Sequence, residues 1–296
     1  METSKNKFTN LDKIFWPAEG YTKGDVINYY NSVYKYIIKY LKGRPQSLFR
    51  TPNGIKDKGF FQKDAGEQAP DWVDKYPSWS DSAAKKVNYL VCNDKPSLLY
   101  LANLGCIELN PWNSTVAHPD NPDYIIIDID PSENNTYNQV IETALTVKKI
   151  LDKGGAASYC KTSGATGMHV FIPLAAKYNY EHARTFAEII ATMVQHELAD
   201  FTTLERSLSK RGKDHIYIDF QQNKIGSTIA CAYSLRPRPG APVSTPLEWP
   251  ELKKGLKAEQ FNIKNTAKRL EKKGDLFAGV LKKGIDIEKC LKKLSA

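Results

Sequence analysis

The most telling stretch of the sequence is Tyr124-Ile125-Ile126-Ile127-Asp128-Ile129-Asp130, which Pro131 follows directly. Its β-branched residues predict a strand, and a proline without an amide hydrogen suits the end of that strand. Side chains alternate along a strand, so Asp128 and Asp130 share one face. The opposite face carries only isoleucine. We therefore expect a strand that is anchored in the core and presents two carboxylates near its end.

The regions around this strand alternate between helical and extended patterns. Thr22, Asp25 and Gly43 supply start and stop signals for a helix. Helical spacing marks 22–41, 95–104, 136–153 and 180–198, and strand patterns mark 157–161, 168–173, 215–220 and 227–232. Such alternation predicts an α/β or α+β fold.

The two carboxylates of the first strand need a partner. Like charges about 4 Å apart repel by roughly 4 kcal/mol at an effective dielectric near 20. A shared proton or a bound cation relieves this, and Mg²⁺ and Mn²⁺ prefer carboxylate oxygens. Asp219, near the end of a second strand pattern, is a third candidate. With Asp128 and Asp130 it would form a two-metal site for phosphoryl transfer. D-x-D also occurs in glycosyltransferases, phosphatases and solvated strand ends.

A glycine-bearing turn, Lys161-Thr162-Ser163-Gly164-Ala165-Thr166-Gly167-Met168-His169, joins the next two strand patterns. Gly164 and Gly167 permit the close approach of a ligand to the backbone. Ser163 and His169 are suited to binding phosphate oxygens. An ordinary hairpin turn is the alternative. The sequence lacks the G-x-x-x-x-G-K-[ST] pattern of a P-loop.

Charge is concentrated near the C-terminus. The net charge is +9, and the basic segment 251–296 has thirteen Lys/Arg against six Asp/Glu. Such a segment suits an anionic partner, most commonly nucleic acid, or two solvated surface helices.

Other bulk features limit the class of protein. Hydrophobic residues make up 41% and charged residues 25%, as in ordinary globular proteins. Five cysteines without a C-x-x-C pair indicate buried, reduced thiols rather than zinc or disulfides. Residues 1–10 are polar, and the sequence has no apolar run of 18 residues. We therefore expect no membrane association and a cytoplasmic, nucleoid-associated location.

The order of Asp128 and Asp130, then Ser163 through His169, then Asp219 resembles the three motifs of the archaeo-eukaryotic primase superfamily. The closer resemblance is to the polymerase domain of bacterial end-joining ligase D, in its stand-alone form. It covers about residues 8–276. It implies one domain over 1–296 with a primase-polymerase fold: an antiparallel-rich central sheet flanked by helices, with two lobes forming a cleft.

The resemblance also assigns DNA-binding residues. The stretches Leu11-Asp12-Lys13-Ile14-Phe15-Trp16-Pro17 and Gly20-Tyr21-Thr22-Lys23 are similar to the family's N-terminal signature, in which Lys13 and Lys23 hold a 5′-phosphate. Phe60 and Phe61, with Lys63 close behind, resemble the base-stacking pair. Stacking on aromatic side chains contributes roughly 1–3 kcal/mol per base.

On the nucleotide side, the resemblance assigns five residues, which are Ser163, His169, Arg236, Gln222 and Arg50. Arg236 would face the triphosphate with its guanidinium fork. Two positions depart from the family. Asn110 replaces the usual histidine before Pro-Trp, and Thr166 stands where related chains often carry lysine.

The resemblance implies a DNA-directed polymerase that fills gaps in non-homologous end joining, prefers ribonucleotides and uses Mn²⁺ or Mg²⁺. Expected partners are DNA with 5′-phosphate ends or gaps, nucleoside triphosphates, Ku and a separate ATP-dependent ligase, since no K-x-D-G ligase motif is present. Two alternatives remain. One is a primase that makes primers in replication or damage tolerance, and the other is a DNA-end-binding scaffold with weak catalysis.

Overall fold

The computed structural model of the protein describes residues 5–80 and 84–296, so the first four residues of the polar N-terminal stretch lie outside it. The chain folds into two compact units. The first unit contains the residues up to Ala117, with Thr228–Thr245 and Phe261–Gly274. The second contains His118–Ser227, Pro246–Gln260 and Asp275–Ala296. Each unit is therefore assembled from segments that are far apart in the sequence.

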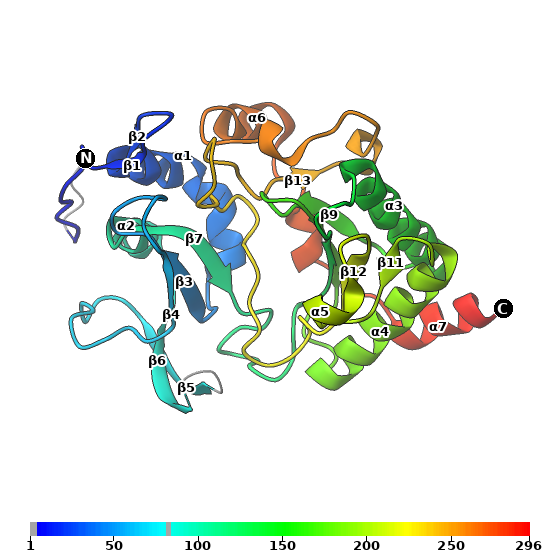
Figure 1. Cartoon of the computed structure of the whole chain (residues 1–296). Helices are drawn as coiled ribbons and strands as arrows, with labels where there is room; N and C mark the ends of the chain where they lie inside the picture. The colour runs from blue at the N-terminus through cyan, green and yellow to red at the C-terminus, as the bar shows by residue number, and fades with distance from the viewer. Residues whose placement is uncertain (1–4, 81–83) are drawn as a thin grey trace. The chain divides into compact units, whose positions relative to one another are not determined.

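The second unit is built on a six-stranded sheet. Its strands are β8 (Tyr124–Asp130), β9 (Tyr159–Thr162), β10 (Met168–Pro173), β11 (Thr202–Thr203), β12 (Ile216–Asp219) and β13 (Pro246–Leu247). They lie in the order β11-β12-β8-β10-β9-β13. Figure 1 labels β9, β11, β12 and β13 of this sheet. Every neighbouring pair is antiparallel except β11 and β12. The expected antiparallel-rich sheet is confirmed.

Helices flank this sheet. They are α3 (Tyr137–Gly154), α4 (Tyr180–Glu197), the short α5 (Leu208–Arg211) and α7 (Ile287–Ser295), with 3-10 turns η1 (Trp249–Glu251), η2 (Ala258–Gln260) and η3 (Ala278–Leu281). A capping box at Thr136 begins α3, and Gly155 ends it with φ of 71°. The contacts of α3 and α4 with β8 and β10 cover the sheet.

The two faces of β8 differ as the alternation predicts. Ile125, Ile127 and Ile129 are fully buried. The other face is apolar at one end, where Phe277 packs on Phe171 of β10 with ring centroids 5.0 Å apart. Burial of the apolar surface thus fixes the strand and leaves its last acidic residues at the margin of the core.

The described residues of the first unit form three small sheets and three helices. Its strands are β1 (Ile14–Trp16), β2 (Tyr21–Thr22), β3 (Gln46–Arg50), β4 (Phe60–Gln62), β5 (Lys75–Ser80), β6 (Lys85–Leu90) and β7 (Cys106–Pro111), and its helices are α1 (Lys23–Leu41), α2 (Lys95–Asn103) and α6 (Thr266–Lys273). Strands β4, β3 and β7 form a three-stranded antiparallel sheet. The predicted capping box between Thr22 and Asp25 begins α1.

One prediction about local structure is wrong. The strand predicted over 227–232 is absent from the described chain except for one isolated bridge, between Thr228 and Trp112. The Cys231 amide bonds to the Leu109 carbonyl, whereas the Ser227 amide bonds to the nearby Lys224 carbonyl. The basic segment 251–296 is divided between the two units, and its residues Leu270, Val280 and Cys290 are buried.

The prediction of buried thiols is confirmed, because all five cysteines are buried and none forms a disulfide within the described residues. Among residues 5–80 and 84–296, no helix combines the length and the apolar composition that crossing a bilayer demands.

Candidate active site

The three predicted acids lie together at one end of the central sheet. Asp219 of β12 pairs directly with Asp128 of β8, and Tyr217 pairs with Asp130. Paired residues of antiparallel strands project to the same face, and residues two apart on one strand do so too. All three carboxylates therefore stand on the face of the sheet opposite Ile125, Ile127 and Ile129. The sequence analysis expected Asp219 as the third member of this group.

Two of the acids contact a basic side chain. The Asp128 Oδ1 lies 3.4 Å from Nε2 of His169, whose strand β10 is the other neighbour of β8. The Asp130 Oδ2 accepts a hydrogen bond of 3.2 Å from Nη2 of Arg211. The positive charge of Arg211 reduces the repulsion expected between Asp130 and the other two acids.

Asp219 is held differently, by neutral donors. Its Oδ1 accepts from the Gln221 amide at 2.7 Å and from the Tyr217 hydroxyl at 3.2 Å, and its Oδ2 accepts from Nε2 of Gln222 at 3.2 Å. Burial raises the pKa of this carboxyl, and these bonds offset part of the rise. A cation nearby would favour its ionised form.

Arg211 is the functional candidate that the sequence did not reveal. It ends the short helix α5, its side chain is 5% exposed, and its guanidinium lies 5.1 Å over the Tyr217 ring. Its Nε and Nη1 are buried without a hydrogen-bond partner in the part of the chain that is described. No motif in 208–211 marks this residue, and only its contact with Asp130 identifies it.

The chemistry of the three acids suits divalent metal ions. Three carboxylates on two paired strands are the oxygen donors that Mg²⁺ and Mn²⁺ prefer. The Arg211 guanidinium already places a positive charge next to the Asp130 carboxylate. In the described residues, no three His, Cys, Asp or Glu side chains enclose an ion as they stand. Metal binding would therefore require Asp130 to exchange Arg211 for the ion.

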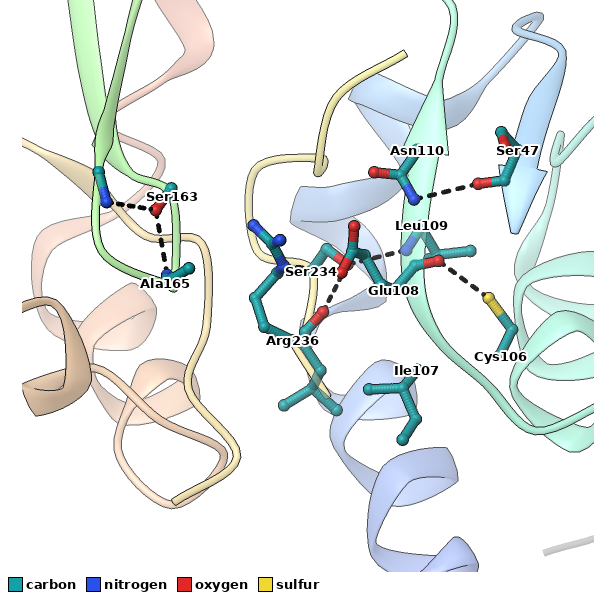
Figure 2. A network of polar contacts seen from close by, with 12 residues as sticks. Ser47, Cys106, Ile107, Glu108, Leu109, Asn110, Ser163, Ala165, Ser234 and Arg236 are labelled. Carbon is teal, nitrogen blue, oxygen red and sulfur yellow. Dashed lines mark hydrogen bonds and ion pairs between the residues drawn. The ribbon is translucent and has the colours of Figure 1, made fainter. Parts of the chain in front are cut away.

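The glycine turn after β9 is closed by Ser163. Its Oγ accepts hydrogen bonds from the amides of Ala165 at 3.0 Å and Gly167 at 3.1 Å (Figure 2). Gly167 has no room for a side chain, because a Cβ there would lie 2.2 Å from the carbonyl oxygen of Ile129. The turn is thus fixed against the end of β8, beside the acids.

The first unit contains a second polar group, around Arg236. Its Nε donates to Oε2 of Glu108 at 2.7 Å, and both side chains are largely buried (Figure 2). The pair lines a pocket of about 400 Å³ together with Phe49, Thr51, Ile55, Asp57, Gly59, Phe61, Pro237 and Arg238. The ion pair holds the guanidinium in one orientation.

Asn110 lies two residues after Glu108 in β7. It is 3% exposed, and its amide donates to the Ser47 carbonyl at 3.1 Å.

Lys13, Lys23 and Arg50 line a pocket of about 230 Å³ in the first unit. Nζ of Lys23 donates to the Thr9 carbonyl at 2.8 Å, and Nζ of Lys13 donates to Oδ1 of Asn53. Burial lowers the pKa of Lys23, and the charges of Lys13 and Arg50 lower it further. Three cations confined in this way favour an anion, and a phosphate group fits that need.

Phe60 and Phe61 are exposed by 46% and 60%, so neither is a core residue. The Arg50 guanidinium lies 5.4 Å over the Phe60 ring, and its Nη1 donates to Gln62 at 2.7 Å. Phe61 contacts Phe49 at 4.9 Å between ring centroids. Lys63 follows β4 directly and is half-buried. Arg50, expected at the nucleotide, thus joins the lysine pocket to an exposed aromatic surface.

Comparisons with known proteins agree with these features. The model of the LigD primase-polymerase domain matches residues 22–277. The bifunctional non-homologous end joining protein LigD of Bacillus subtilis is 33% identical over 274 residues, which cover 92% of this chain and 44% of that protein. The multifunctional LigD of Mycolicibacterium smegmatis is 29% identical over 275 residues, covering 92% and 35%. The chain therefore spans less than half the length of these relatives.

One solved structure is similar over almost the whole chain. The polymerase domain of Mycobacterium tuberculosis ligase D, in complex with DNA, has a TM-score of 0.88 and 26% identity. The match covers 96% of this chain and 100% of that one. The expected primase-polymerase fold is confirmed.

Proposed function

Because the chain belongs to the LigD primase-polymerase domain family, we propose that it is a DNA-templated nucleotidyltransferase that extends primer 3′ ends. Gap filling during non-homologous end joining is its proposed setting, as the names of its relatives suggest. The observation that carries the proposal is the pairing of Asp128 with Asp219 beside Asp130. Phosphoryl transfer depends on positioning and on charge neutralisation, and these acids offer a place for both.

Asp128, Asp130 and Asp219 would hold two Mn²⁺ or Mg²⁺ ions. When bound, such ions lower the pKa of the attacking 3′-hydroxyl and offset the negative charge that develops at the α-phosphate. The chain's own residues orient the substrates. Ser163 fixes the turn beside the acids, His169 lies against Asp128, and Gln222 holds Asp219. Arg236, already fixed by Glu108, is the proposed ligand for the triphosphate.

The proposed DNA substrate has a 5′-phosphate at an end or gap. The pocket formed by Lys13, Lys23 and Arg50 supports this, because confined cations bind a terminal phosphate dianion more strongly than a diester. The exposed rings of Phe60 and Phe61 support base stacking next to that phosphate. A primase that starts chains without a downstream strand would need no such pocket. Ribonucleotide preference, Ku and a separate ATP-dependent ligase complete the proposal, on family membership alone.

A scaffold that binds DNA ends with weak catalysis is the second candidate. It is favoured by one observation, that no three acidic, histidine or cysteine side chains of the described residues enclose an ion as they stand. A titration with Mn²⁺ separates the candidates, because a scaffold needs no ion at the three acids.

The direct experiment is primer extension on a one-nucleotide gap with a 5′-phosphate or a 5′-hydroxyl. Mn²⁺ or Mg²⁺ and ribonucleotides or deoxyribonucleotides are supplied in parallel. We expect templated addition, faster on the phosphorylated gap and with ribonucleotides. Asp128→Ala should reduce it by more than about a hundredfold, as loss of a group that organises transition-state charge does. Addition by Asp128→Ala at the normal rate would refute the assignment of the acids.

A further inference from the structure

Lys161 is a lysine in the interior of the second unit. It belongs to β9, its exposed fraction is 0%, and it is among the largest fully buried side chains. An ammonium group taken out of water loses its hydration, so a fold keeps one there only where nearby groups replace that hydration. Its Nζ lies 5.5 Å from the centre of the Phe171 ring, which supplies part of the replacement.

The pairing of the strands puts Lys161 in line with the acids. Lys161 of β9 pairs with His169 of β10, His169 pairs with Asp128 of β8, and Asp128 pairs with Asp219 of β12. The four side chains therefore form one row across four strands of the sheet. Exposure rises along the row, from 0% at Lys161 to a 19% exposed side chain at Asp128. The lysine is thus the buried end of a polar row whose other end carries the proposed metal ligands.

The contacts in this row are directional. Nζ of Lys161 lies 2.7 Å from Nδ1 of His169, and Nε2 of the same ring lies 3.4 Å from Oδ1 of Asp128. With Lys161 in its ammonium form, which has donors and no acceptor, the short contact requires a lone pair on Nδ1. A neutral imidazole then carries its proton on Nε2, on the side of Asp128.

We propose that Lys161 is a positioning residue that holds His169 in the tautomer with its proton on Nε2, directed toward Asp128. The ring then presents an N–H, rather than a lone pair, to the carboxylate and to substrate oxygens beside it. Without Lys161, the proton could move to Nδ1, and two lone pairs would face each other between His169 and Asp128. The consequence for catalysis rests on the proposed function, whereas the tautomer does not.

A purely structural role for Lys161 is the competing explanation. In that case the ammonium fills space and the state of His169 is set elsewhere. The two explanations predict different protonation of Nδ1 and Nε2 of His169, which nitrogen-15 NMR measures directly. The chain has five histidines, so the spectrum is tractable, and His169→Gln identifies the signals of His169.

The experiment records long-range proton–nitrogen spectra of the full chain at pH 8, without divalent ions. In the wild type we expect a protonated Nε2 and an unprotonated, hydrogen-bonded Nδ1 at His169. Lys161→Met keeps an unbranched side chain that ends one atom short of Nζ and removes the donors, and it should shift the Nδ1 signal of His169 or mix the tautomers. Lys149→Met, an exposed lysine paired with Glu197, is the control and should leave His169 unchanged.

A wild-type spectrum with the proton on Nδ1 would overturn the proposal without any variant, so misfolding of Lys161→Met cannot hide the result. An unchanged His169 spectrum in a folded Lys161→Met protein would overturn it equally. In gap filling, Lys161→Met should raise KM for the nucleotide by about tenfold to a hundredfold, as loss of an orienting partner does, with DNA affinity unchanged. If the tautomer is confirmed and the wild type adds no nucleotide, the proposed function fails and the assignment of Lys161 stands.

Discussion

Asp128 and Asp219 face each other directly across β8 and β12, and they are held by unlike partners. Asp128 lies against His169, whereas Asp219 accepts hydrogen bonds from the neutral donors of Tyr217, Gln221 and Gln222. Two carboxylates on one face of a sheet are thus kept in place before any ion binds. Repulsion between these two carboxylates destabilises the fold, so the stability of the protein should depend on pH and on divalent ions.

Asp219→Asn should stabilise the metal-free protein near neutral pH. Burial raises the pKa of this carboxyl in the folded state. The protonated carboxyl therefore contributes its full stabilisation when the pH is below the pKa of the unfolded chain, about 3.8. This contribution is lost as the pH rises through the pKa of the folded state. We expect the substitution to raise Tm at pH 7 by about 2–4 °C in EDTA, and to change it little at pH 3.5.

Calorimetry at the two pH values tests this contrast. The exposed Asp214 provides the control, because Asp214→Asn should shift Tm equally at both. A lower Tm for Asp219→Asn at pH 7 would show that its hydrogen bonds outweigh its buried charge. Mn²⁺ should raise the Tm of the wild type and have little effect on the variant.

Arg211→Ala should strengthen metal binding while it weakens the metal-free fold. The Arg211 guanidinium, 3.2 Å from Asp130, occupies the carboxylate that an ion would need. An ion pair with one half-exposed partner contributes up to about 1 kcal/mol, so its loss should tighten Mn²⁺ binding by roughly twofold to fivefold. Titration calorimetry gives the affinity. Lys213→Ala, which breaks the exposed pair with Glu133, should leave Mn²⁺ affinity unchanged, and an equal gain there would indicate a general charge effect.

The strands that hold the acids could be predicted from the sequence. Tyr124–Asp130 and Met168–Pro173 form strands with the bounds expected. Their β-branched residues favour extended backbone, and the neighbouring proline or glycine marks where each strand ends or begins. The glycine turn was predictable for the same local reason. The sequence also indicated Asp219 as the third acid, because it lies near the end of a second strand pattern.

Other features depend on contacts between distant segments. Arg211 reaches Asp130 from the short helix α5, far along the chain, and no local pattern encodes that contact. Lys161 and His169 lie on strands joined by the predicted glycine turn, but the contact of their side chains depends on the register of that hairpin. The strand predicted over 227–232 has a suitable pattern, but the Cys231 amide bonds to the Leu109 carbonyl and the segment makes no ladder. The place of Arg50 between a phosphate pocket and Phe60 could likewise be seen only in the fold.

Lys13→Ala with Lys23→Ala should abolish the preference for a 5′-phosphate. Burial and the charges of Lys13 and Arg50 lower the pKa of Lys23, so its ammonium group loses its proton at a lower pH than an ordinary lysine does. The preference in the wild type should therefore decline as the pH rises into the alkaline range, sooner than general DNA binding does. Fluorescence anisotropy with phosphorylated and unphosphorylated gaps measures both.

The expected loss is about tenfold in affinity for the phosphorylated gap, with the unphosphorylated gap changed much less. The exposed Lys35 and Lys42 serve as the control, because Lys35→Ala with Lys42→Ala removes two charges outside the pocket. If the double variant still discriminates between the two gaps, the phosphate is bound elsewhere.

Phe60→Ala and Phe61→Ala should weaken DNA binding without destabilising the protein. Both rings are exposed, so their removal deletes little buried surface, although Phe61 also gives up its contact with Phe49. Loss of one stacked base should cost roughly 1–3 kcal/mol, which is about fivefold to more than a hundredfold in affinity. Phe60→Tyr keeps an aromatic face and is the matched control. A large fall in Tm with unchanged DNA affinity would instead make these side chains part of the fold, and the exposed surface beside Arg50 would then have no role in binding bases.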